Sequence, residues 1–312
     1  MTPRRYGPHM SRRYHVFVND AAGSVGEADT ELSDITNAFR EVGIDAKVVA
    51  ISPERLPAAM REAWQPGIDA LVVAGGDGTI NAAADVAVAN DMVLGVLPMG
   101  TFNHFAKDLG MTAELSAAVK FLADAEITPI DVGEVNNRIF VNNASIGVYP
   151  TMVVEREDIH RRLGWGKIRA APIAIVRTLR RLPVHHLRVT LDRSAPVDVV
   201  TPFLFVGNGL FDENGVRVGQ RTSLTDHRLG VYVIATSSRW RLVVNAVKAR
   251  LGGVRSAAQT ERRSAETLTV DSSEPSLAIA LDGEPTDLRV PLVFRSRAGA
   301  LRVLAAPGQA ER

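Results

Sequence analysis

The sequence predicts two domains, an N-terminal α/β domain and a β-rich domain after it. Three observations predict this architecture. The chain has 312 residues, of which 46% are hydrophobic, so it is long enough for two domains with sizeable cores. Strand and helix patterns alternate over the first 125 residues, whereas short strand patterns separated by turn signals follow after about residue 127. We expect a basic tail at 1–13, the α/β domain at 14–126, the β-rich domain at 127–305 and a short tail at 306–312.

The elements of the α/β domain are predicted from the spacing of their apolar residues. Ser52 is the expected N-cap of the second helix, and Pro53 its first helical residue. Because single helices separate short apolar strands, we expect a parallel sheet covered on both faces. In chain order, the expected elements are a strand at 14–18, a helix at 27–43, a strand at 45–51, a helix at 52–64, a strand at 69–75, a helix at 80–90 and a strand at 92–98.

The second domain is predicted to be β-sandwich-like, because many short strands follow one another with turn residues between them. Its first hairpin, at 127–148, is expected to turn at Asn136-Asn137. The segment 237–256, rich in arginine and alanine, is expected to form an inserted helix. Further strands are expected as a pair within 187–208 and then at 228–235, 266–272, 276–283, 291–296 and 300–305.

Composition excludes several classes of protein. The formal net charge of +1 argues against nucleic acid as the main partner. There are no cysteines, which excludes a disulfide framework and thiolate zinc sites and favours a reducing, cytoplasmic compartment. No run of 18 apolar residues is present, so we expect no membrane span. The first 13 residues are charged and lack the apolar core of a secretory signal.

A glycine-rich turn follows the third expected strand. It reads Gly75-Gly76-Asp77-Gly78-Thr79 and leads into the third expected helix. Ligands bind at the carboxyl ends of parallel strands, and a helix N-terminus offers free amides to a phosphate. A carboxylate tolerates a phosphate beside it only with a metal ion or a proton between them. The turn therefore predicts a nucleoside triphosphate site with magnesium, and the alternative is a plain strand-to-helix turn.

A similar turn follows the fourth strand. Pro98 ends that strand, Gly100-Thr101 repeat the glycine and the hydroxyl group, and Asn103 is the expected cap of the next helix. Because the two strand ends are neighbours in a parallel sheet, we expect the two turns to line one crevice.

Three motifs in this order resemble those of the diacylglycerol kinase catalytic family, and in particular its small soluble bacterial lipid kinases. They are GGDGTIN at 75–81, PMGTFNHFAKDLG at 98–110 and LDGE at 281–284. The resemblance implies a phosphofructokinase-like α/β domain, a β-sandwich-like second domain and an ATP site in the cleft. It implies transfer of the γ-phosphate of ATP to a lipid hydroxyl group. NAD kinases carry a similar first motif, so a nucleotide kinase is an alternative, as is a catalytically silent lipid or nucleotide sensor.

The resemblance also implies roles for individual residues. Glu284 matches the usual proton acceptor, for which Asp77 is the alternative. From the residues alone, Asp282 is a second acid beside Glu284, and paired carboxylates near a phosphate suit a base; the alternative is a polar turn between two strands. Two positions depart from the family pattern: His104 replaces an aspartate, and His227 replaces a glycine. Magnesium is expected in the second domain on Asp226 and the main-chain carbonyls of Ser223 and Arg228. The residues expected to hold ATP are Gly75, Gly76, Asp77, Gly78, Thr79, Ile80, Asn81, Gly100, Thr101 and Asn103.

Two basic stretches predict peripheral binding to an anionic membrane. The stretch 159–190 has eight lysines and arginines and no acid, and 237–263 has seven with one acid. Each contains a tryptophan among the basic residues, which is typical of membrane-surface binding. The alternative for each is a solvated helix face. We expect a diacylglycerol-like acceptor and a possible homodimer, while the acceptor lipid itself stays open among several classes.

Overall fold

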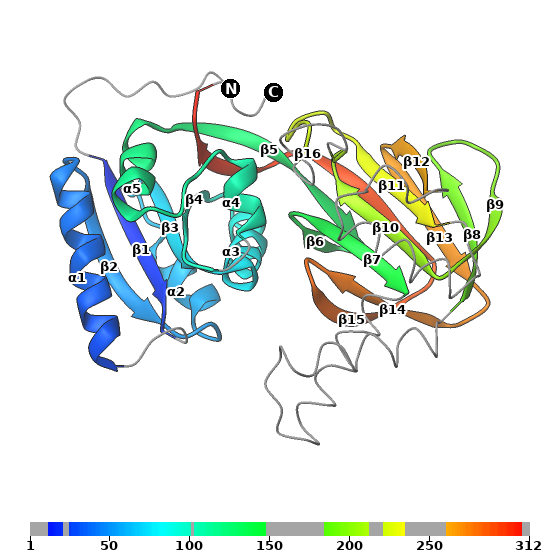
Figure 1. The fold of residues 1–312 in the computed structure, drawn as a ribbon, viewed down its shortest axis with the longest axis horizontal. Coiled ribbons are helices and arrows are strands. Elements are labelled where there is room, and N and C mark those ends of the chain that lie inside the picture. The colour runs from blue at the N-terminus through cyan, green and yellow to red at the C-terminus, as the bar shows by residue number, and fades with distance from the viewer. Residues whose placement is uncertain are drawn as a thin grey trace, which may run out of the picture. The chain divides into compact units, whose positions relative to one another are not determined.

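The computed structural model describes residues 12–20, 25–100, 103–147, 184–211, 221–234 and 260–307. They fall into two compact units, shown with their elements in Figure 1. Unit 1 lies within 1–132, 220–226 and 297–312, and unit 2 lies within 133–219 and 227–296. This division differs from the expected single boundary near residue 127, because two segments from the C-terminal half of the chain belong to unit 1.

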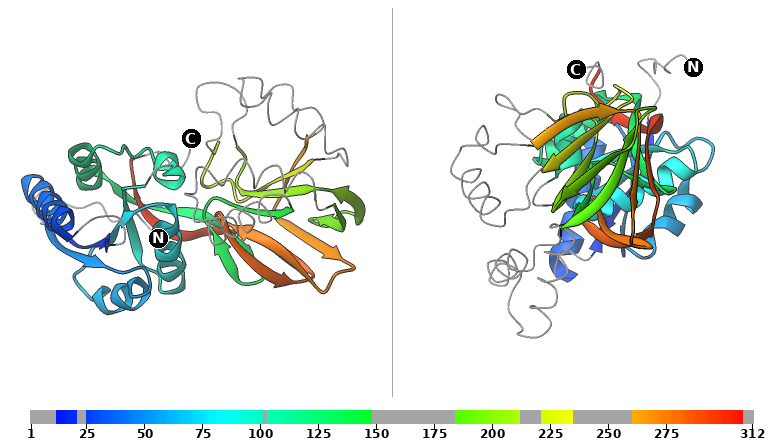
Figure 2. Two further views of the ribbon diagram at one scale, coloured as in Figure 1. Left: turned by 60° about the horizontal axis from the view of Figure 1, so that its bottom comes forward. Right: turned by 90° about the vertical axis from the view of Figure 1, so that its right-hand side faces the viewer.

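Unit 1 is built on a parallel sheet with the strand order β2-β1-β3-β4, and β16 adds a further parallel strand beside β4. Helix α1 packs with α5, and α2 packs with α3. Figure 2 shows these two pairs on opposite faces of the sheet, as predicted. The elements are β1 (Arg13–Asn19), α1 (Val25–Glu41), β2 (Asp45–Ile51), α2 (Leu56–Ala63), β3 (Ala70–Gly75), α3 (Asp77–Ala89), β4 (Val93–Pro98), α4 (His104–Asp108) and α5 (Leu115–Asp124), with parts of β5 (Glu126–Val135) and β16 (Leu292–Ala305).

The two central strands of unit 1 explain the apolar runs in the sequence. All six residues of β3 and all six of β4 are buried, because helices cover both faces of the sheet. The side chain of Glu114 caps α5 by accepting hydrogen bonds from the amides of Ser116 and Ala117 at 2.9 and 2.7 Å. These backbone hydrogen bonds lower the pKa of Glu114, because they favour its charged form.

Two predicted helix starts in unit 1 are wrong. Helix α2 begins at Leu56 rather than at Pro53, and its N-cap is Arg55. The carbonyl of Ser52 instead accepts the amides of Arg55 and Leu56 in a preceding turn. Helix α3 begins at Asp77, three residues before the predicted start, so the glycine-rich turn supplies the first turn of the helix itself.

Unit 2 has a β-sandwich-like core between two sets of antiparallel strands. One set has the order β12-β11-β10-β7-β14-β15, and the other consists of β16, β13, β8 and β9. Buried residues from both sets form one hydrophobic cluster, which includes Ile146, Leu204 and Phe294. The elements are β6 (Arg138–Phe140), β7 (Asn143–Gly147), β8 (His185–Leu191), β9 (Val197–Thr201), β10 (Phe203–Asn208), β11 (Leu229–Ile234), β12 (Thr260–Ala265), β13 (Thr267–Ser272), β14 (Ser276–Leu281) and β15 (Glu284–Arg289).

The turn chemistry of unit 2 follows its sequence. Asn136 and Asn137 both have positive φ, at 46° and 66°, and join β5 to β6 as predicted. The two strands expected at 291–296 and 300–305 are one strand, β16, so that expectation is wrong. The helix expected at 237–256 lies outside the described residues. Within the described residues, no helix is long and apolar enough to cross a membrane.

Candidate functional site

The turn between β3 and α3 presents uncapped backbone amides. Gly76 is the N-cap of α3, has an extended conformation and offers no side chain to accept a hydrogen bond from the first helical turn. The amides of Asp77, Gly78 and Thr79 therefore lie at the positive end of a 13-residue helix without a side-chain cap. Such an end is suited to an anion, and a phosphate group is the commonest biological example.

The predicted neighbourhood of the two glycine turns is present in unit 1. The amide of Met99 donates to the carbonyl of Gly75 at 3.0 Å, which joins the end of β4 to the end of β3. A Cβ atom on Gly100 would lie 2.6 Å from the Cα of Gly76 and 2.8 Å from Oδ1 of Asn103. Glycine is thus needed at 100 for the two turns to touch each other, whereas a Cβ on Gly76 would make only an ordinary contact, at 3.6 Å from the Cα of Gly100. The sequence pattern did not indicate this reason.

The end of β1 adds a residue that sequence reasoning missed. The side-chain amide of Asn19, the last residue of β1, donates to the hydroxyl group of Thr79 at 2.9 Å. Gly75 makes room for this threonine, since a Cβ there would lie 2.8 Å from the Cβ of Thr79. Asn19 could have been found from its position, because β1 lies next to β3 and ligand-binding residues gather where parallel strands end.

The carboxylate of Asp77 is held by the start of α4. Its Oδ2 accepts the amide of Asn103 at 3.1 Å, and its Oδ1 accepts the amide of His104 at 3.0 Å. Each oxygen keeps a further lone pair for a metal ion or a hydroxyl group. Asn103 is the N-cap of α4 by position, but its side chain makes no cap hydrogen bond and binds Gly100 instead. The capping carboxylate comes from Asp77, so the predicted role of the Asn103 side chain is corrected.

Three other residues expected to hold a nucleotide have different environments. Ile80 is fully buried and its amide bonds the carbonyl of Gly76, so neither group is left for a ligand. The side-chain nitrogen and oxygen of Asn81 are buried without a hydrogen-bond partner. Because buried polar groups are almost always satisfied, this orphaned amide fits a site that takes up a polar ligand or water. Thr101 lies outside the described residues.

The turn that carries Glu284 lies in unit 2. Asp282 and Gly283, with φ of 48° and 93°, join β14 to β15, and the exposed Glu284 is the first residue of β15. The carboxylate of Asp282 accepts three backbone amides, those of residues 141, 142 and 143, at 2.7 to 2.9 Å. Asp282 therefore fixes the turn that carries Glu284. Its carboxylate oxygens bind backbone amides, so the structure gives it a structural role beside Glu284.

The segment expected to hold magnesium keeps its turn without the glycine. His227 takes φ of 58°, the left-handed conformation in which glycine is usual. The hydroxyl group of Ser223 accepts the amide of Thr225 at 3.1 Å, and Asp226 is half-buried. The guanidinium group of Arg228 donates to the hydroxyl oxygen and carbonyl of Ser264 at 2.5 and 3.1 Å. Among the described residues, no group of three or more acidic, histidine or cysteine side chains could hold a metal ion, so magnesium here would rely on main-chain carbonyls besides Asp226.

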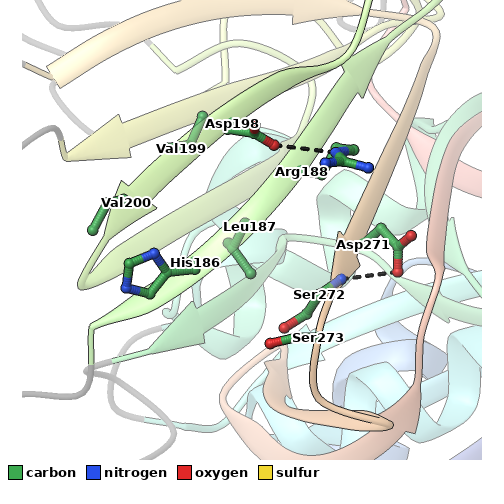
Figure 3. A pocket seen from close by; sticks show the side chains of 9 residues that line it. All are labelled: His186, Leu187, Arg188, Asp198, Val199, Val200, Asp271, Ser272 and Ser273. Carbon is green, nitrogen blue, oxygen red and sulfur yellow. Dashed lines mark hydrogen bonds and ion pairs between the residues drawn. The ribbon is translucent and has the colours of Figure 1, made fainter.

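A hollow of about 470 Å³ lies elsewhere in unit 2, over β8, β9 and the end of β13 (Figure 3). Its charged groups already have partners. Arg188 pairs with Asp198 at 3.1 Å, and Asp271 accepts the amide of Ser272 at 2.9 Å. The hollow carries none of the predicted catalytic or nucleotide-binding residues.

Comparisons with known proteins agree with the motifs. Residues 13–135 match the family model of the diacylglycerol kinase catalytic domain, and residues 150–305 match the YegS C-terminal NAD kinase beta sandwich-like domain. A probable lipid kinase YegS-like protein of Pseudomonas aeruginosa is 32% identical over 251 residues, which cover 78% of this chain and 79% of the relative. Another, from Klebsiella pneumoniae, is 33% identical over 132 residues, which cover 41% of this chain and 44% of the relative. The chain thus spans less than half of the Klebsiella protein.

The crystal structure of a putative diacylglycerol kinase from Bacillus anthracis has the same fold. It superposes with a TM-score of 0.72 at 21% identity and covers 95% of this chain and 98% of that chain. This likeness confirms the two-domain fold class, an α/β domain with a β-rich domain.

Proposed function

Because the chain belongs to the diacylglycerol kinase family of lipid kinases, we propose that it transfers the γ-phosphate of ATP to a hydroxyl group of a membrane lipid. The observation that carries the proposal is the turn between β3 and α3. It brings uncapped helix amides and a fixed carboxylate, Asp77, to one edge of a parallel sheet. Amides bind phosphate oxygens, and the carboxylate favours a hydrated metal ion between itself and the phosphates.

The residues present fit a magnesium–ATP complex. The amides of Gly78 and Thr79 would hold phosphate oxygens, and the free lone pairs of Asp77 would hold magnesium or its water. The orphaned amide of Asn81 is a further polar group in the second turn of α3. Bound magnesium supplies neutralisation of the negative charge on the phosphates.

Within this proposal the two carboxylates have separate tasks. Both oxygens of Asp77 already accept a backbone amide, so this side chain is held in place and is suited to positioning the nucleotide. Glu284 is exposed and stands on an anchored turn, which is suited to removing the proton of the acceptor hydroxyl group. A positioned base contributes roughly 10²- to 10⁴-fold to such a transfer.

The acceptor is proposed to reach the enzyme from an anionic membrane surface on the cytoplasmic side. The two basic stretches that support this are mostly outside the described residues, so the support is their sequence alone. Replacing Arg161, Arg162 and Lys167 by glutamate is expected to weaken binding to vesicles that contain phosphatidylglycerol and to raise the apparent KM for lipid in those vesicles. Each basic residue at such a surface is worth about 1 kcal/mol. Activity on a short-chain, water-soluble acceptor should survive, and an equal loss on both acceptors would contradict membrane binding.

The function itself is tested by incubating the protein with γ-labelled ATP, magnesium and one acceptor at a time. The acceptors are diacylglycerol, monoacylglycerol, phosphatidylglycerol, a sphingoid base, a polyprenol and NAD, and the products are separated by thin-layer chromatography. Label on one of the lipids is the expected result. Label on NAD would establish the nucleotide kinase instead, and ATP binding without any transfer would indicate a silent sensor.

A further inference from the structure

The orientation of Asp77 depends on a helix too short to be stable by itself. Both oxygens of its carboxylate are held by the two amides at the start of α4, those of its N-cap Asn103 and of its first residue His104. Helix α4 has only five residues, and an isolated helix of that length is not stable in water. Whatever holds α4 in place therefore also sets the position of the Asp77 carboxylate.

A buried ion pair holds the other end of α4. Asp108, the last residue of the helix, accepts the Nε of Arg221 at 2.8 Å and the backbone amide of Arg221 at 3.3 Å. The two side chains are only 6% and 1% exposed. The guanidinium carbon also lies 5.7 Å from the centre of the ring of Phe105, which is fully buried on the same helix. Arg221 thus contacts two of the five residues of α4, Phe105 and Asp108.

The segment that carries Arg221 is itself fixed in unit 1. Residues 220–226 belong to unit 1, although the residues before and after them in the chain belong to unit 2. The carbonyl of Leu224, three residues after Arg221, accepts the amide of Asp131 at 2.8 Å. The segment that carries Arg221 therefore has a contact within unit 1 that does not involve α4.

A buried ion pair is a poor way to gain stability alone. Removing two charges from water is costly, and apolar residues of similar volume often stabilise a protein equally well or better. An arginine–aspartate pair instead fixes the relative orientation of the two segments that carry it, because its hydrogen bonds set both the distance and the rotation of the groups that they join. Here the orientation of α4 matters, because the amides at its start hold the carboxylate of Asp77.

We propose that Asp108 and Arg221 are positioning residues of the ATP site, which fix α4 and, through its first two amides, the carboxylate of Asp77. This inference rests on the proposed kinase function. A misplacement of about 1 Å in a catalytic constellation can cost roughly 10²-fold in rate. Loss of the pair should therefore lower kcat/KM for ATP by about 10- to 100-fold.

The test replaces the pair without leaving a buried charge. In the double variant Asp108→Leu/Arg221→Met, apolar residues occupy both positions, and the fold is expected to be retained. The readouts are kcat/KM for ATP, the KM for the lipid acceptor, and the hydrogen exchange of the amides of residues 103 and 104. We expect a lower kcat/KM for ATP, an unchanged lipid KM and faster exchange. Arg221→Lys keeps the charge and should recover part of the activity.

Arg302→Met is the matched control. It makes the same arginine-to-methionine replacement in unit 1, at a pair with Asp91 that is far more exposed, and it should alter none of these values. Unchanged kcat/KM for ATP in a folded double variant would overturn the proposal, whatever its melting temperature. If that variant does not fold, Arg221→Lys decides the matter, and wild-type kcat/KM together with wild-type amide exchange would overturn it.

A failure of the proposed kinase function is recognised separately. It would show as a wild-type protein that labels no lipid. In that case the binding of magnesium–ATP, measured by calorimetry, replaces kcat/KM for the wild-type protein and the variants. Amide exchange still reports whether the pair fixes α4. Equal ATP affinity in all of them, or no ATP binding at all, would overturn the proposal.

Discussion

Asp77→Asn is expected to lower phosphoryl transfer by at least about 10²-fold and to destabilise unit 1 by a small amount. Asparagine removes the negative charge that would face magnesium. It also replaces one of the two oxygens that accept the amides of Asn103 and His104 with an NH₂ group, which cannot accept a hydrogen bond. One amide keeps an acceptor and the other loses it.

The size of the stability effect follows from that count. A hydrogen bond to a charged group contributes about 1.5–3 kcal/mol, and Asp77 is only half-buried, so we expect a loss of about 1–2 kcal/mol. For a unit of this size, 1 kcal/mol lowers the Tm by about 2–4 °C, which gives an expected fall of about 2–8 °C. The fold should therefore be intact at 25 °C.

The assay combines thermal unfolding with the transfer of label from ATP to the lipid acceptor, at a temperature below both melting transitions. Asp124→Asn is the control, because it makes the same change at an exposed carboxylate at the end of α5 in the same unit. Turnover within about threefold of the wild type would refute the role of Asp77 in transfer. An unchanged Tm would show that its two amide contacts add no stability.

Three further outcomes are expected. Gly100→Ala should weaken magnesium–ATP binding at least tenfold by calorimetry, because its methyl group would push the two turns apart at Gly76; unchanged affinity would contradict the close approach. Asp226→Ala should lower the Tm and reduce the stabilisation by added magnesium. If the Tm is the same with and without magnesium in both the wild type and the variant, the expected magnesium site is contradicted. Burial lowers the pKa of His185 below 6.5, and Glu274 opposes this only in part, so the folded state disfavours the protonated imidazole. Stability should therefore be lost as the pH falls below about 6.5, where the unfolded state binds the proton first; His185→Gln, but not the exposed His186→Gln, should flatten that loss in urea unfolding at pH 7, 6 and 5.

Local chemistry alone was enough to predict the strands β1 to β4 and the first hairpin turn of unit 2, whereas β12 and β15 were missed and β16 was divided in two. The apolar runs of β3 and β4 identify buried strands, because a strand covered on both faces needs apolar residues at every position. The pair Asn136-Asn137 identifies a hairpin turn, because asparagine tolerates positive φ. These features depend on residues a few positions apart, so a single sequence contains them.

The partners of the functional groups were decided only by the tertiary structure. Asp77 meets amides 26 and 27 residues later in the chain, and Arg221 meets an aspartate 113 residues earlier. Periodicity reports that a side chain is buried or at a strand end, but it does not report which distant residue packs against it. The same reason explains the early start of α3, where the tertiary contact of Asp77 with α4 outweighs the weak helix propensity of Gly78. Packing brings Asn19, Asp77 and the residues around Gly100 to the glycine-rich turn, and only that placement supports the proposal of a phosphate site there.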